Sequence, residues 1–132
     1  MSQKPESRLA KYIFSKVRKD VYFEKINNQF RAGIPDYYVE GPGNILWVEV
    51  KWIEKPWTKN LEPSKICRTA SWTKQRHWLE RAHKNGKQTC VIVGTGSGQS
   101  TKGYILEYPY GYDMVDIQSV NEITKWIENK VL

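Results

Sequence analysis

The chain has 132 residues, of which 21 are lysine or arginine and 14 are aspartate or glutamate, so its formal net charge is +7 at pH 7 and its pI is about 9.4. This length is typical of one domain with a real core, and the positive charge favours a polyanionic partner. Two cysteines, Cys67 and Cys90, are too few for a disulfide framework, and no apolar run is long enough to cross a membrane. We therefore expect one domain, 1–132, in a soluble cytoplasmic protein without a membrane partner.

The first predicted element is an amphipathic helix over residues 5–18, which begins at Pro5 and has an apolar stripe of Leu9, Ala10, Ile13 and Val17. Glu6 continues this stripe at the helix start. Its carboxylate either complements the helix dipole there or reaches toward the acidic patch described next. A short strand is predicted over residues 21–26, followed by a polar loop that contains Arg31.

A β-hairpin is predicted by two β-rich runs, 37–40 and 45–52, on either side of a Gly-Pro-Gly-Asn turn. If the turn is centred between the proline and the second glycine, Asp36 lies opposite Glu49, and directly opposed side chains share one face of a sheet. Lys51 lies on the same face because side chains alternate along a strand. These three side chains are therefore expected to converge on one patch.

The patch has a structural and a chemical interpretation. It is either a solvated hairpin face with a Glu–Lys neighbour pair or a site at which a divalent cation lies between Asp36 and Glu49. Opposed carboxylates repel each other, burial of an unpaired charge is costly, and oxygen ligands suit Mg²⁺. Lys51 would then lie beside the metal, where it could contact a phosphate or hold an attacking water. The chemical interpretation is favoured because the strand is otherwise apolar, with one face filled by Leu46, Val48 and Val50.

A long irregular stretch over residues 53–71 follows the hairpin, and it mixes basic residues with tryptophan, as suits contact with phosphates and bases. A disordered surface loop is the alternative. A second helix is predicted over residues 72–84, closed by Asn85-Gly86, and Gln75 lies on its apolar stripe, either as a satisfied core amide or as a site residue. The expected contacts to a nucleic acid are Arg31, Lys55, Lys59, Lys65, Arg68, Lys74, Arg76 and Arg81.

Buried strands are predicted over residues 89–93 and 103–108. The glycine-rich segment 94–98 between them lacks the Lys-Ser/Thr of a phosphate-binding loop, so we expect a flexible turn and no nucleotide cofactor. An aromatic loop over 108–112 and a final helix over 119–130, which carries Trp126, offer apolar surface for a homodimer. Alternatively, both features cover the sheet of the same molecule.

The segment Gly33-Ile34-Pro35-Asp36, followed by Trp47-Val48-Glu49-Val50-Lys51 and by Gln75, resembles the PD-(D/E)XK nuclease superfamily, and in this longer form the virus-type replication-repair nucleases and the Holliday-junction resolvases of phages and archaea. The resemblance covers residues 6–93. Together with the order of the predicted elements, it implies a restriction-endonuclease-like α/β sandwich in which helices flank a central mixed β-sheet. It also implies that Asp36, Glu49 and the backbone carbonyl of Val50 bind Mg²⁺, for which Mn²⁺ would substitute.

In the same resemblance, Lys51 assists the attacking water, and Gln75 and Glu6 complete the catalytic site. The function expected is Mg²⁺-dependent endonucleolytic hydrolysis of DNA, resolvase-like or structure-selective, by a homodimer. If the protein is encoded by a phage, it would act in the cytoplasm of the host cell. One alternative is a site-specific double-strand endonuclease of the restriction or homing kind. Another is a DNA-binding domain without activity, against which the intact Asp36, Glu49 and Lys51 argue.

Overall fold

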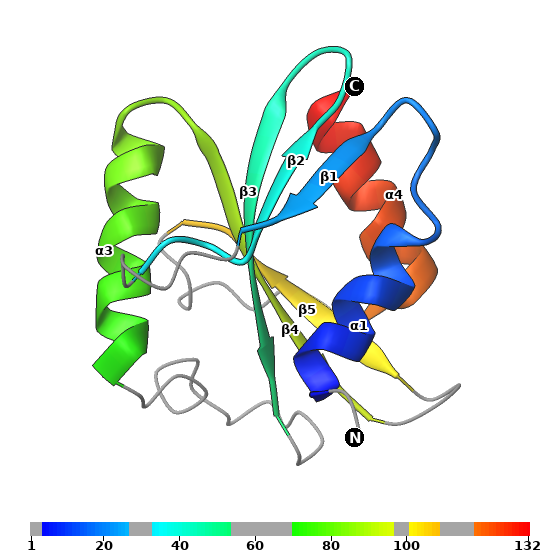
Figure 1. Cartoon of the computed structure of the whole chain (residues 1–132), viewed down its shortest axis with the longest axis horizontal. Helices are drawn as coiled ribbons and strands as arrows, with labels where there is room; N and C mark the ends of the chain where they lie inside the picture. Colours follow the sequence, from blue (N-terminus) through cyan, green and yellow to red (C-terminus); the bar gives the residue numbers. More distant parts are fainter. Residues whose placement is uncertain (1–3, 27–32, 54–69, 97–100, 109–117) are drawn as a thin grey trace.

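The computed structural model describes residues 4–26, 33–53, 70–96, 101–108 and 118–132. Within these ranges a six-stranded β-sheet is flanked by three helices (Figure 1). The helices are α1 (Pro5–Phe14), α3 (Ala70–Lys84) and α4 (Val120–Val131). The strands are β1 (Tyr22–Lys25), β2 (Tyr37–Glu40), β3 (Ile45–Trp52), β4 (Gln88–Thr95), β5 (Lys102–Leu106) and the two-residue β6 (Gln118–Ser119).

The sheet is mixed, and its strands lie side by side in the order in which they follow one another in the chain. All neighbouring pairs are antiparallel except β3 and β4, which are parallel. A parallel pair needs a crossover connection, and here the connection contains α3. The central pair of strands therefore runs in one direction, and hairpin-like strands extend the sheet on both sides.

The β2–β3 hairpin has the register predicted from its turn, with Val39 opposite Leu46 and Tyr37 opposite Val48. The backbone N–H of Gly41 donates to the carbonyl of Asn44 at 3.0 Å and closes the loop. The N–H groups of residues 43 and 44 both donate to the carbonyl of Val131, at 3.0 and 3.1 Å. The tip of the hairpin is thus bound to the C-terminal end of α4.

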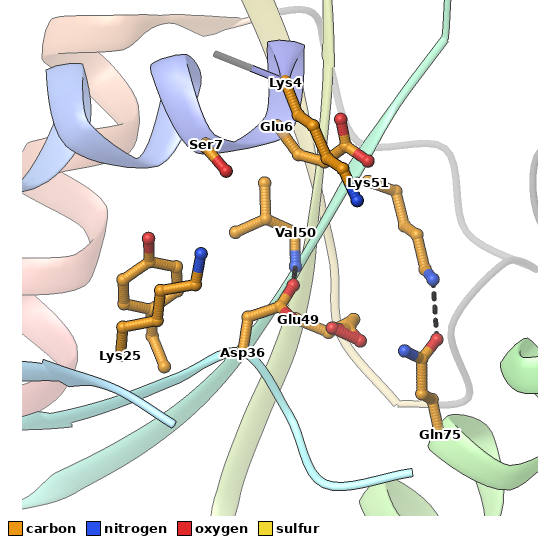
Figure 2. Close-up of a pocket in the computed structure, with 10 residues that line it drawn as sticks. Lys4, Glu6, Ser7, Lys25, Asp36, Glu49, Val50, Lys51 and Gln75 are labelled. Atoms are coloured by element: carbon orange, nitrogen blue, oxygen red, sulfur yellow. Dashed lines mark hydrogen bonds between the residues drawn. The ribbon is translucent and has the colours of Figure 1, made fainter. Parts of the chain in front are cut away.

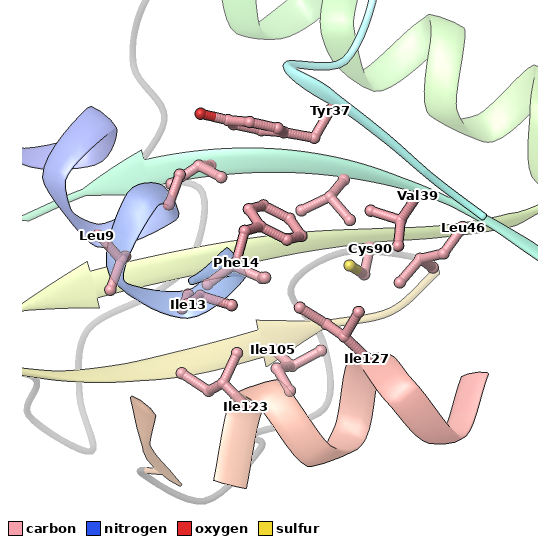
Figure 3. Close-up of a cluster of buried hydrophobic side chains, with 14 of the residues drawn as sticks. Leu9, Ile13, Phe14, Tyr37, Val39, Leu46, Cys90, Ile105, Ile123 and Ile127 are labelled. Carbon is pink, nitrogen blue, oxygen red and sulfur yellow. The ribbon is translucent and has the colours of Figure 1, made fainter. Parts of the chain in front are cut away.

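Helices cover both faces of the sheet, with α1 and α4 on one face and α3 on the other (Figure 1). Alternation along β4 divides the core, because Cys90 and Ile92 pack toward α1 and α4 whereas Val91 and Val93 pack toward α3. The larger cluster combines α1, α4 and the central strands (Figure 3) and includes Leu9, Ile13, Phe14, Val39, Leu46, Ile105, Ile123 and Ile127. The predicted α/β sandwich with a central mixed sheet is confirmed.

Several predicted boundaries are wrong. The first helix ends at Phe14 rather than at residue 18, because the segment that follows binds α4: Lys16 Nζ donates to Asn121 Oδ1 at 3.0 Å, and the N–H of Arg18 donates to Glu128 Oε2 at 2.9 Å. Val17 still packs against the core from outside the helix.

The strands on either side of the glycine-rich segment also have other ends than predicted. Residues 94 and 95 belong to β4 instead of a flexible turn, and they pair with residues 103 and 102 of β5. The fifth strand ends at Leu106, not at residue 108, and β6 was not predicted. The remainder of the predicted turn, 97–98, lies outside the described residues, as do most of the irregular stretch 53–71 and residues 109–112 of the aromatic loop. None of the helices in the described ranges has both the length and the apolar character that crossing a membrane requires.

Candidate active site

Asp36 lies directly before β2 and is fixed by both neighbouring strands. Its backbone carbonyl accepts a hydrogen bond from the N–H of Ile26 at 2.8 Å, and its carboxylate Oδ2 accepts one from the N–H of Val50 at 3.0 Å. Upstream, Gly33 has a φ of 97°, and a Cβ at this position would lie 2.8 Å from the carbonyl oxygen of Lys74 in α3. A glycine is therefore needed for the chain to pass α3 closely on its way to Asp36.

Glu49 is completely buried in β3, although it is charged in water at neutral pH. Its two carboxylate oxygens, Oε1 and Oε2, have no hydrogen-bond partner among the described residues. The pKa of Glu49 is raised from 4.5 to about 10, chiefly by burial and also by the adjoining carboxyl of Asp36, whereas the ammonium of Lys51 acts in the opposite direction. A buried, unsatisfied carboxyl is costly, so this position is expected to serve a ligand.

Lys51 shares the sheet face of Glu49 and is held by α3. Its Nζ donates to Gln75 Oε1 at 2.6 Å and lies 5.6 Å from the centre of the Trp72 ring. Gln75 is therefore a partner of the lysine and not a core amide. The side-chain oxygen of glutamine is a hydrogen-bond acceptor, so this bond sets the position of the Lys51 ammonium group beside the two carboxylates.

These side chains line one cavity of about 230 Å³, which we call the catalytic pocket (Figure 2). Glu6 and Lys4 approach it from the start of α1, and Gln75 approaches from α3. The pocket brings together carboxylates from three segments with three lysines, and its lining consists of Lys4, Glu6, Ser7, Lys25, Asp36, Tyr37, Glu49, Val50, Lys51 and Gln75. The formal charges of this lining balance, so an added cation and an added phosphate would both find partners.

The donors of the catalytic pocket fit a hard divalent cation. The oxygens of Glu49 have no described partner, and the carboxylate of Asp36 lies on the same side of β3. Mg²⁺ is typically held by one or two carboxylates and otherwise keeps waters or substrate oxygens. Binding there would displace the proton of Glu49 and remove the cost of its unpaired burial. Glu6 also lines the pocket, but among the described residues no three histidine, cysteine or carboxylate side chains lie close enough together to hold a metal ion.

The six residues predicted for catalysis and metal binding all line this pocket, namely Asp36, Glu49, Val50, Lys51, Gln75 and Glu6. Their chemical roles stay predictions. The predicted DNA contacts Lys74, Arg76 and Arg81 lie on α3 but do not line the pocket. Lys74 and Arg81 are exposed, whereas Arg76 forms an ion pair with Glu80 at 2.8 Å. The other predicted contacts, Arg31, Lys55, Lys59, Lys65 and Arg68, lie outside the described residues.

Four lining residues were missed by the sequence analysis: Lys4, Ser7, Lys25 and Tyr37. Lys25 faces Tyr37 across β1 and β2, but no short turn joins these strands, so their register could not be predicted. Ser7 follows Glu6 directly, and its position next to a candidate carboxylate was the one available signal.

Neither a family model nor a curated protein matches the sequence of this chain. Among solved structures, the chain is similar to Hjc, a Holliday junction resolvase of Archaeoglobus fulgidus, with a TM-score of 0.53 and 12% sequence identity over 92% of this chain and 97% of that one. The chain has the resolvase fold. It is also similar to a structure described as a VRR_NUC domain, with a TM-score of 0.49 and 27% identity over 70% of this chain and 87% of that one. The predicted restriction-endonuclease-like fold is confirmed by the likeness to the resolvase.

Proposed function

We propose that the protein is a metal-dependent DNA endonuclease of the resolvase type, which hydrolyses phosphodiester bonds at junctions or branches. The observation that carries this proposal is the buried carboxyl of Glu49, whose oxygens no described residue satisfies, beside Asp36 and near the Lys51–Gln75 pair. Carboxylates that can hold a divalent cation, with a lysine beside them, suit metal-assisted phosphodiester hydrolysis. The resolvase fold supports the same assignment.

Asp36, Glu49 and the carbonyl of Val50 are the residues that would hold Mg²⁺, or Mn²⁺ in its place. A bound divalent cation would polarise the scissile phosphate and offset the negative charge that develops on it. The hydrogen bond from the N–H of Val50 to Asp36 Oδ2 fixes the two strands relative to each other, so the carboxylates are placed before the ligand arrives.

Lys51 is the residue that would position or activate the attacking water. Its ammonium group is held by Gln75 Oε1, so Gln75 acts through the lysine as a positioning residue. Glu6 lines the pocket from α1 and would accept a hydrogen bond from that water. Lys51, Gln75 and Glu6 all belong to secondary-structure elements, and rigid elements hold a catalytic geometry better than loops do.

DNA would approach over the basic surface of the molecule, for which the net charge of +7 supplies the attraction. Lys74 and Arg81 on α3 are exposed and available to phosphates, and the ion pair with Glu80 makes Arg76 a weaker candidate. The basic residues of the stretch 53–71 are proposed as further contacts. We also propose that the protein is a homodimer, because two cuts related by a two-fold axis need two such pockets.

Cleavage assays on three DNAs test this function: a four-way junction, a random-sequence duplex and genomic duplex, each with Mg²⁺ and with excess chelator. We expect cleavage of the junction in Mg²⁺ and none in chelator, with Glu49→Ala and Asp36→Ala inactive but still able to bind DNA. Cleavage of genomic duplex at defined sites would instead favour a restriction or homing endonuclease. Binding of all DNAs without cleavage in Mg²⁺ or Mn²⁺ would overturn the nuclease and leave a DNA-binding domain.

A further inference from the structure

We propose that a second cavity, between α1 and β1, binds an unpaired nucleotide next to the scissile phosphate. In this assignment Lys11 and Lys25 contact the backbone phosphate of that nucleotide, and its base lies against Phe23. The substrate would then be a branched DNA whose strand is unstacked beside the cut. This inference rests on the proposed nuclease function of the catalytic pocket, and its test separates the two.

The second cavity, which we call the α1–β1 hollow, has a volume of about 500 Å³. It shares Ser7, Lys25 and Tyr37 with the catalytic pocket, so the two cavities adjoin. Figure 2 shows Ser7 and Lys25 on the side of Asp36 that lies away from Gln75. A DNA strand with a phosphate at Asp36 and Glu49 would therefore place a neighbouring nucleotide at the hollow.

The charge of the hollow favours an anion. Its lining includes the exposed side chains of Lys11 and Lys25 and contains no carboxylate. Neither lysine has an ion-pair partner among the described residues. The catalytic pocket, by contrast, has as many carboxylates as lysines. A phosphate next to the scissile one would thus find two uncommitted cations in the hollow, and phosphate contacts of this kind position a strand.

The other walls of the hollow are aromatic. The ring of Phe14 stacks on Phe23, with a centroid distance of 4.9 Å and an interplanar angle of 17°, and lies 4.8 Å from the ring of Tyr37. Phe14 and Tyr37 are buried, but 41% of Phe23 is exposed on an edge strand. An exposed phenyl ring backed by a buried one is a rigid surface on which a base of any sequence can stack.

Base stacking on Phe23 sets a condition on the substrate. A base inside a duplex has both of its faces covered by its neighbours, so it reaches an aromatic side chain only when it is unstacked. Junctions, flaps and single-stranded arms provide such a nucleotide, whereas uniform duplex does not. The hollow therefore predicts a preference for branched over linear DNA through contact with one unpaired base.

A second exposed aromatic surface is less suited to DNA. Tyr22 and Tyr38 lie on the opposite face of β1 and β2, with a ring-centroid distance of 6.5 Å. The hydroxyl of Tyr38 donates to Glu40 Oε1 at 2.6 Å, and Glu24 lies opposite Tyr38 in the sheet. Two carboxylates beside these rings would repel a phosphate backbone, so the α1–β1 hollow is the site assigned.

The test is an abasic scan in chelator, where binding is measured by fluorescence anisotropy without cleavage. Single abasic sites are placed at each position of a splayed or branched DNA, and wild type is compared with Phe23→Ala. We expect an abasic site at one position to lower the DNA affinity of wild type about tenfold, as loss of one base–aromatic stack does. The same abasic site should lower the DNA affinity of Phe23→Ala less than twofold. An equal loss in both proteins at every position would overturn the assignment.

One further variant guards against a folding defect, and another tests the phosphate contact. Phe23→Leu keeps an apolar contact with Phe14 and should also lose the abasic effect, because a leucine offers no aromatic face. Lys25→Ala changes an exposed side chain and should flatten the log–log dependence of affinity on salt by about one unit. Lys125→Ala, which removes an exposed lysine from α4, is the matched control and should leave the slope unchanged. If the salt dependence of affinity had the same slope for Lys25→Ala and wild type, the proposed contact between Lys25 and a phosphate would be wrong.

The two proposals fail in different ways. Mg²⁺-dependent cleavage without coupling between Phe23 and any abasic position would overturn the hollow and leave the nuclease standing. Coupling at one position without cleavage in any metal would overturn the nuclease and leave a DNA-binding hollow. Coupling at a position adjacent to the mapped cut is the result expected if both are right.

Discussion

At the scale of single residues, Glu49 is completely buried, and no described residue forms a hydrogen bond with either of its carboxylate oxygens. A carboxyl in this position can be stabilised in two ways, by a proton or by a cation. The raised pKa means that the proton is kept at neutral pH when no cation competes for it. Metal binding must then release this proton, so metal affinity is expected to rise with pH.

Glu49→Gln is expected to stabilise the protein kept in chelator, by an amount that grows with pH. The unfolded chain releases the Glu49 proton near its ordinary pKa of 4.5, whereas the folded protein keeps it up to a pKa of about 10. Between these values the folded state binds more protons than the unfolded state, so the free energy of unfolding falls as pH rises, by on the order of 1 kcal/mol per pH unit. Glutamine removes this loss. Thermal unfolding of both proteins at pH 6 and pH 8 measures the effect.

A Tm difference between the two proteins that is the same at both pH values would contradict the raised pKa of Glu49. Mg²⁺ supplies the matching control. It should raise the Tm of wild type, because a ligand that binds only the folded state stabilises it, and should leave Glu49→Gln nearly unchanged.

Gln75→Ala is expected to lower kcat for DNA cleavage by about 10- to 100-fold, the usual effect of removing a partner that orients a catalytic group, with little change in KM. The reason is the 2.6 Å hydrogen bond from Lys51 Nζ, which is lost in the variant. Gln75→Glu keeps an acceptor and should recover part of the rate. His77→Ala, an exposed position on the same helix, is the control. A normal kcat for Gln75→Ala in single-turnover assays would remove Gln75 from the site.

At the scale of elements, the hairpin was predictable in full because a four-residue turn fixes which residues oppose each other. Once the turn was recognised, the pairing of Val39 with Leu46 and the meeting of Asp36 with β3 followed from strand geometry alone. The two carboxylates of the candidate site could therefore be placed from the sequence. The position of Lys51 on the same face as Glu49 follows from the alternation of side chains along β3.

Features that depend on contacts between distant elements were not predictable. The end of α1 is set by hydrogen bonds to α4, whose partners lie more than a hundred residues away in sequence. The place of Lys25 depends on a β1–β2 register that no short turn determines. From the sequence, Gly94 is predicted to lie in a turn, because glycine weakens strands. Its actual role is to leave room for a helix, which only the packed structure reveals.

Gly94→Ala is expected to destabilise the protein by about 1–3 kcal/mol, the usual cost of overpacking a core. A Cβ at this position of β4 would collide with Leu9 Cδ2 of α1 and lie 2.9 Å from Trp52 Cε3. Because the collision needs the leucine, Leu9→Ala combined with Gly94→Ala should cost less than the two separate losses together. Urea unfolding of the four proteins measures this coupling. Strictly additive losses would show that the glycine is required for another reason.

At the scale of the whole molecule, the catalytic pocket lies where the three layers meet. Glu6 comes from one helical layer, Gln75 from the other, and the carboxylates from the sheet between them. Because α1 and α3 both pack on buried strands, the packing of the core holds the two helices that contribute to the pocket in place. One molecule has one such pocket among its described residues, and under the proposed function one pocket would cut one strand at a time.

The protein should act as a homodimer with two catalytic pockets. Two-fold symmetry is the commonest arrangement of soluble homo-oligomers, and it matches the paired cuts that a junction requires. The described part of α4 covers the protein's own sheet, with Trp126 half-buried beside that core, so we do not expect α4 alone to form the interface. Light scattering at micromolar concentration measures the oligomeric state.

Mixed dimers then connect assembly to chemistry. Active subunits mixed with Glu49→Ala subunits should give heterodimers that nick one strand of a junction, because only one of their two pockets can bind the cation. The proportion of nicked to fully cut product should rise with the proportion of variant, as random pairing requires. A strictly monomeric protein that cuts both strands in a single encounter would refute the dimer, since one pocket would then have to serve both strands without release.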